Sequence, residues 1–112
     1  MWFIFPQIAG LGQSSMSIRF AVASLDEAEA YLAHPVLGAR LRECAQVTLE
    51  VEGKTARDIF GGIDEMKFRS SMTLFARAAS DKDLFQRCIV KYFAGASDPA
   101  TIAKLQGQNS IS

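Results

Sequence analysis

DEMKFRSSMTLFARAA, residues 64–79, is the stretch of sequence that decides the fold class. Its apolar residues recur every three or four positions, which places them on one stripe of an α-helix. The stripe consists of Phe68, Met72, Phe75 and Ala79. The pattern assigns the polar residues on the other side to solvent: Arg69, Thr73 and Arg77. The spacing therefore predicts an amphipathic helix that opens at Asp64 and packs one face into a core.

Capping signals on the N-terminal side of this stretch predict more helices. Ser24 with Glu27 three residues later is a capping box, which opens one of them. The buried face of that helix is expected to contain Leu25, Ala28 and Leu32. His34-Pro35 ends it, and Pro35 suits the first position of the next helix. A short helix is also expected over residues 13–22.

The segment VTLEVE, residues 47–52, alternates apolar and polar residues, a pattern typical of a strand. A lone strand in a helical chain would lack a partner, so we expect a helix that ends near Gly53. Further helices are expected over residues 55–60, from the capping residues Ser80 and Asp83 to Gly95, and over residues 98–105. Residues 106–112 are predicted to be a frayed tail.

Together these elements predict an all-α protein, a single compact domain over residues 1–112. The domain would contain about six short helices and an aromatic, irregular N-terminal segment. Hydrophobic residues make up 49% of the chain and charged residues 21%, which is ordinary for a globular domain. Twelve basic residues balance twelve acidic ones, so no general attraction to nucleic acid is expected.

The uncharged opening WFIFPQIAGLG, residues 2–12, resembles neither an export signal nor a membrane anchor. Arg19 is the first basic residue, whereas a signal peptide carries its positive charge ahead of the apolar run. A membrane-spanning helix needs about 20 apolar residues, far more than this run contains. We therefore expect no membrane partner. A cytoplasmic location is expected, with Cys44 and Cys88 as buried, reduced thiols.

The same opening contains most of the candidate ligand-binding residues, and the favoured ligand is a small anionic molecule. Aromatic and amide side chains would form one wall of the pocket: Trp2, Phe5 and Gln7. Backbone N–H groups of a turn, together with a guanidinium, would hold the anion: Gly10, Gly12, Ser14 and Arg19. His34 or Ser71 would add polar contacts.

Structural roles compete with each of these assignments. The turn that ends at Ser14 is more simply a helix cap. His34 stands at a helix boundary, where bonding a helix end or packing beside Pro35 is the favoured role. Ser71 falls inside the apolar arc of its helix, and the carbonyl four residues back is the preferred partner for its hydroxyl. An opposing Gln7 or a ligand is the alternative.

No residue set in the chain suggests catalysis. There is one histidine, and the two cysteines lack zinc-ligand spacing, so no catalytic residue, metal or cofactor is predicted. We therefore favour a protein that is not an enzyme. The alternative to small-molecule binding is a protein–protein interaction module, which would show an exposed apolar patch of a few hundred Å² or more.

Four segments in this order resemble a family of small, mostly helical bacterial proteins catalogued as domain of unknown function 1810. They are MWFIFPQIAGLG (1–12), YLAHPVLGARL (31–41), RSSMTLF (69–75) and YFAGASDPATIAKL (92–105). The resemblance covers Met1 to about Leu105 and implies an all-α fold with no established activity. Family members have a further helical segment ahead of the tryptophan, usually with Ser-His just before it. The resemblance therefore implies that this chain lacks the family's N-terminal segment.

Overall fold

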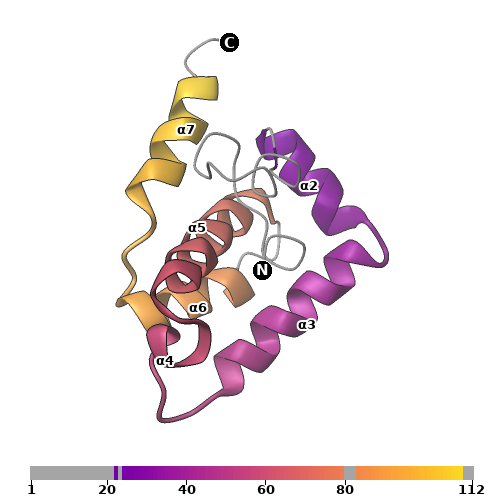
Figure 1. The fold of residues 1–112 in the computed structure, drawn as a ribbon. Helices are drawn as coiled ribbons and strands as arrows, with labels where there is room; N and C mark the ends of the chain where they lie inside the picture. The colour runs from indigo at the N-terminus through magenta and orange to yellow at the C-terminus, as the bar shows by residue number, and fades with distance from the viewer. Residues whose placement is uncertain (1–21, 23, 80–82, 110–112) are drawn as a thin grey trace.

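Helix α5, Gly62–Ala78, occupies the centre of the domain in the computed structural model (Figure 1). Helices α2, α4, α6 and α7 all pack against it, and α3 packs against α2 and α6. Figure 1 shows α2 and α3 meeting at a corner on one side of α5, with α7 on the opposite side. The structure describes residues 22, 24–79 and 83–109. The predicted all-α single domain is confirmed.

From residue 24 onwards, the described residues form a helix at each position where the sequence predicts one. They are α2 (Leu25–Ala33), α3 (Leu37–Glu50), α4 (Ala56–Phe60), α5, α6 (Asp83–Phe93) and α7 (Pro99–Asn109). The radius of gyration is 13.1 Å, close to the value of about 13 Å expected for a compact chain of this length. Among the described residues, no helix combines the length and apolar character needed to cross a membrane.

The apolar stripe of α5 forms the middle of the core, as predicted. Phe68, Met72 and Phe75 are fully buried. The Phe68 ring lies 4.8 Å from that of Phe60 in α4, and the Phe75 ring lies 5.9 Å from that of Phe85 in α6. These offset, tilted rings bury large areas and favour one arrangement of the helices around α5.

The predicted solvent face of α5 is wrong at two of its three residues. Thr73 is 1% exposed, and its hydroxyl donates to Arg69 O at 2.8 Å and accepts from Asp98 N–H at 2.9 Å. Arg69 donates to the carbonyls of Ala96 and Ser97 at 2.8 and 3.0 Å. Only Arg77 is exposed. The pattern was misleading because the turn before α7 covers this side of α5 with backbone groups that need polar partners.

Asp98 fastens the start of α7 to α5. Its Oδ2 accepts from Ser70 Oγ at 3.1 Å, from Thr101 N–H at 3.0 Å and from Thr101 Oγ at 2.6 Å. Pro99 follows at the first helical position, where its missing N–H costs nothing. The helix then continues to Asn109, beyond the expected end at Leu105, so residues 106–109 belong to α7 rather than to a frayed tail.

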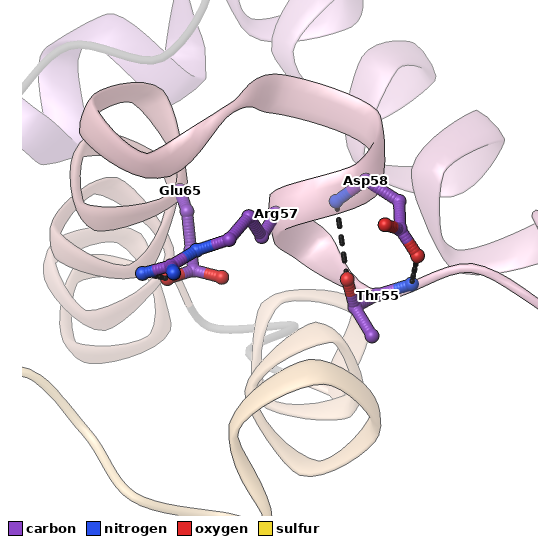
Figure 2. A network of polar contacts seen from close by, with 4 residues as sticks. All are labelled: Thr55, Arg57, Asp58 and Glu65. Carbon is purple, nitrogen blue, oxygen red and sulfur yellow. Dashed lines mark hydrogen bonds and ion pairs between the residues drawn. The ribbon is translucent and has the colours of Figure 1, made fainter.

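The junction of α4 and α5 contains the polar network drawn in Figure 2. Thr55 and Asp58 form a complete capping box: Asp58 N–H donates to Thr55 Oγ at 3.1 Å, and Thr55 N–H donates to the carboxylate at 2.9 Å. These hydrogen bonds lower the pKa of Asp58, the Thr55 backbone donor most. Arg57 lies 3.7 Å from Glu65, and Gly61 between the helices has a φ of 83°, which favours glycine.

The segment with alternating polarity is helical over residues 47–50, as expected, and α3 ends at Glu50 rather than near Gly53. Packing against α6 explains why the alternation does not form a strand. Tyr92 OH donates to Thr48 O, and the Lys91 ammonium donates to the carbonyls of Leu49 and Val51. A cation at the last carbonyls of a helix also opposes its macrodipole, so α6 stabilises the end of α3.

Two expectations near the N-terminus have different outcomes. Ser24 is the N-cap of α2, as predicted, and its hydroxyl accepts from Glu27 N–H at 3.2 Å. The predicted capping box is only half formed in the described structure, because the reciprocal bond to the Glu27 carboxylate is not made. The predicted helix over residues 13–22 lies outside the described residues except for Val22, which is buried and not helical.

Candidate functional site

His34 joins α2 to α3. Its Nδ1 accepts hydrogen bonds from Val36 N–H at 3.1 Å and Leu37 N–H at 3.0 Å, so the imidazole caps the first turn of α3. The predicted role for His34 at a helix end is confirmed. Pro35, however, is not the first helical residue, because α3 begins at Leu37. The imidazole acts here as the acceptor that Ser or Asp usually provides at an N-cap.

His34→Ala is expected to lower the free energy of unfolding by about 1 kcal/mol, the usual cost of a lost N-cap. His34→Asn keeps a short side-chain acceptor and should recover most of that loss. Urea denaturation of the three proteins measures both effects. Equal stability of the alanine and asparagine variants would show that the Nδ1 hydrogen bonds contribute little.

Gly38 allows α3 to approach the end of α2 closely. A Cβ atom built on this residue would lie 2.1 Å from Leu32 O and 3.1 Å from Arg42 Nη1. Real Cβ atoms essentially never come within 3.0 Å of another group in this way. The glycine is therefore needed for the close contact, and the space that it leaves holds the hydrogen bond from Arg42 to Leu32 O.

Arg42 connects the second turn of α3 to the end of α2. Its Nη1 donates to Leu32 O at 3.0 Å. The carbonyls at the end of a helix lack intrahelical donors, so the guanidinium both satisfies one of them and complements the negative end of α2. This hydrogen bond orients the Arg42 side chain at the corner between α2 and α3.

A groove of about 340 Å³ opens beside this guanidinium, between α2, α3 and the end of α5. Its lining residues are Glu29, Leu32, Ala33, Arg42, Ala78 and Ala79. Four of them are apolar, and the other two carry opposite charges. An apolar wall with a few fixed polar groups is typical of small-molecule sites, although this volume is near the lower end of their range of about 300–1,000 Å³.

Ser71 is fully buried on α5, and its Oγ has no hydrogen-bond partner within the described part of the chain. The preferred interpretation, a hydrogen bond to the carbonyl four residues back, is wrong. Thr73 and Ser70 on the same helix both bond to such carbonyls, at 2.8 and 3.0 Å, so the backbone geometry of α5 permits the bond. Ser71 is not among the residues that line the groove.

Ser71→Ala is expected to raise the free energy of unfolding by up to about 1 kcal/mol, because an unpartnered hydroxyl loses its water on burial and gains nothing in return. Ser70→Ala is the matched control. Its hydroxyl bonds to Met66 O and Asp98 Oδ2, so its removal should cost about 1 kcal/mol. Thermal melts of the ligand-free proteins compare them. A loss of stability in Ser71→Ala would mean that the hydroxyl has a partner in solution.

Comparisons with known proteins agree with this arrangement of helices. The model of a family described as "Protein of unknown function (DUF1810)" matches residues 1–105. The chain belongs to this family. It is similar to the conserved hypothetical protein Rv1873 from Mycobacterium tuberculosis, whose crystal structure superimposes with a TM-score of 0.92 at 46% identity. The match covers 94% of this chain and 75% of the mycobacterial one. A search of curated proteins gave no significant match.

In this member of the family, YLAHPVLGARL forms the corner between α2 and α3. Tyr31 packs its ring 5.5 Å from that of Phe75, His34 caps α3, and Gly38 permits the close approach. This segment of the family resemblance therefore has a structural role, which is to form the corner between α2 and α3. Its last helical turn leads directly to Arg42, which was not among the predicted site residues.

Most of the predicted site lies outside the described residues, and those assignments stay predictions: Trp2, Phe5, Gln7, Gly10, Gly12, Ser14 and Arg19. The groove residues Glu29 and Arg42 were missed. The spacing of these two residues in the sequence does not indicate a shared site, because only the angle between α2 and α3 brings them to one groove.

The described residues contain no group of three or more His, Cys, Asp or Glu side chains placed to hold a metal ion. Both cysteines are free; Cys88 is buried, as predicted, whereas Cys44 is only partly buried. Burial raises the pKa of the Cys88 thiol to about 11, and its Sγ donates to Ala45 O at 3.5 Å. Burial also raises the pKa of Cys44, with a smaller contribution from Glu43. Since the thiolate is the nucleophile, both side chains are poorly suited to covalent chemistry.

Cys88 is expected to react at least 100-fold more slowly than an ordinary thiol with Ellman's reagent at pH 8. With a pKa of about 11, roughly one thiol in a thousand is ionised, compared with about one in four at the usual pKa of 8.5. The variant Cys44→Ser isolates the reaction of Cys88, and unfolding in guanidinium should restore its full rate. Rapid reaction of the folded variant would contradict the burial of Cys88.

Proposed function

We propose that the domain binds a small molecule that carries an anionic group, in the groove between α2, α3 and the end of α5. The observation that carries the proposal is the guanidinium of Arg42, which is oriented by Leu32 O at the edge of an apolar wall. A positively charged group held in place loses little conformational freedom when it binds a ligand.

Arginine suits this role because its planar guanidinium matches carboxylate and phosphate groups. It presents five N–H donors in one plane, and the hydrogen bond to Leu32 O helps to orient that plane. The apolar part of the ligand would contact Leu32, Ala33 and Ala78. The small volume of the groove favours a metabolite of a few heavy atoms over a nucleotide or a peptide.

The alternative function, a protein–protein interaction module, requires a contiguous apolar surface. Large exposed hydrophobic residues of the described part come from three helices and one turn: Val36, Leu37, Val47, Met66 and Val90. Single exposed hydrophobic side chains are normal on protein surfaces and do not by themselves indicate a partner. The groove is therefore the stronger basis for a function. Both cysteines as free thiols support a cytoplasmic setting for it.

The test is a thermal melt against a panel of small carboxylates and phosphates at millimolar concentration. A ligand that binds the folded state alone raises the melting temperature by mass action. Ala78→Leu should abolish the shift by filling the groove, while leaving Arg42 and its hydrogen bond in place. A panel in which no compound raises the melting temperature would overturn the proposal.

A further inference from the structure

Helix α3 carries a second stripe of mainly apolar side chains, separate from the one that it buries. Residues three or four positions apart share one side of a helix. This outer stripe consists of Val36, Arg40, Cys44, Val47 and Val51. Val36 and Val51 are the two cap residues of α3. Val36 is 50% exposed and Val47 is 58% exposed, so the stripe presents apolar surface to solvent.

The outer stripe lies on the opposite side of α3 from the groove. Arg42 follows Arg40 by two positions, and two positions along an α-helix turn the side chain by about 200°. Among the described helices, α3 packs mainly against α2 and α6, and Figure 1 shows it along one edge of the molecule. A partner seated on the outer stripe therefore leaves the groove open.

The spacing of the outer stripe is nearly symmetrical about Cys44. Val36 and Arg40 precede Cys44 by 8 and 4 residues, and Val51 and Val47 follow it by 7 and 3. If two copies of α3 run antiparallel about a two-fold axis at Cys44, Val36 lies opposite Val51 of the other copy, and Arg40 lies opposite Val47. Contacts with two-fold symmetry require a surface that is complementary to itself in this way.

The charges beside the stripe favour the same arrangement. Glu43 and Glu50 lie one turn before and one turn after Val47, on the same side of α3. Arg40, opposite Val47 of the other copy, would therefore lie between two carboxylates of that copy. A parallel pair would instead place Arg40 against Arg40, which is unfavourable. Burial and Glu43 raise the pKa of Cys44 and Arg40 lowers it, so both charged groups act at the centre of the stripe.

We propose that the outer stripe is the contact surface of a homodimer, in which α3 pairs antiparallel with α3 of a second copy. One helix face from each copy is smaller than the standard protein interface of about 1,600 Å², so the dimer should be weak and dissociate in the micromolar range. This inference is independent of the proposed function, because it uses the other side of the helix.

Sedimentation equilibrium of the full chain, from about 1 µM to 1 mM, tests the proposal. Val47→Glu should weaken the dimer at least tenfold, because it places charge in the apolar contact. Val90→Glu is the matched control, since Val90 in α6 is 57% exposed and lies outside the stripe. It should leave the dissociation constant unchanged. A monomer over the whole range, or equal weakening by both variants, would overturn the proposal.

A charge exchange tests the antiparallel pairing directly. Arg40→Glu should be monomeric, and so should the double variant Glu43→Lys, Glu50→Lys, because each places like charges opposite one another. An equimolar mixture of the two should dimerise with an affinity within about tenfold of the original, because every opposed pair is again of opposite sign. Failure of the mixture to associate would contradict the pairing, whereas recovery cannot come from a change in folding.

Discussion

Replacing Gly38 with alanine is expected to lower the free energy of unfolding by about 3 kcal/mol, the upper part of the usual range for overpacking. The new methyl group would lie 2.1 Å from Leu32 O, a backbone atom that cannot rotate away. Alanine normally favours a helix interior by about 1 kcal/mol over glycine, so the steric overlap must outweigh that gain. The melting temperature should fall by roughly 10 °C or more.

Gly62→Ala is the control for this substitution. It also places an alanine in a helix, but the nearest heavy atom to its Cβ would be the Arg57 side chain at 3.9 Å. That variant should be neutral or slightly more stable. If Gly38→Ala also proves neutral, α3 can move away from α2 at little cost, and the corner that positions Arg42 is less rigid than the structure indicates.

The helices of the described residues were largely predictable because local signals agree with the tertiary packing. The capping box of Thr55 and Asp58 involves residues that are close in sequence, and so does the stripe from Phe68 to Phe75. Spacing alone therefore identifies both features. The same reasoning correctly chose helix over strand for residues 47–50, since a strand without a partner has unsatisfied backbone groups.

The errors come from contacts between segments far apart in the chain. Thr73 was assigned to solvent because a helical pattern assumes one buried side, whereas α5 is covered by neighbours on several sides. Its partner, Asp98 N–H, lies 25 residues away. Pro35 was predicted to be the first residue of α3, because the preference of proline for the first turn of a helix is a local signal. The helix instead begins two residues later, where the His34 imidazole caps it.

The candidate site was less predictable than the fold for the same reason. His34 was correctly given a place at a helix end, since the dipeptide His-Pro is a local signal. Arg42 becomes part of a groove only because Gly38 lets its helix cross the end of α2 at close range. Sequence spacing contains no information on that crossing, so a lone arginine on a helix reads as a solvated charge.

Asp98→Ala is expected to cost about 2–4 kcal/mol of unfolding free energy, which combines a lost N-cap with an orphaned buried hydroxyl. Thr101 is fully buried, and its Oγ and N–H both depend on Asp98 Oδ2. Ser70 would keep its bond to Met66 O and lose the one that ties α7 to α5. Chemical denaturation measures the loss.

Asp98→Asn separates the hydrogen bonds from the charge. Asparagine keeps a side-chain oxygen for Thr101 N–H and caps helices about as well as aspartate, so this variant should lose less than about 1 kcal/mol. Hydrogen exchange locates the damage: in Asp98→Ala the amides of α7 should exchange faster, while those around Phe75 in the middle of α5 keep their protection. Uniform loss of protection over both helices would instead show that α7 and α5 unfold as one unit, and that Asp98 supports the whole domain rather than its last helix.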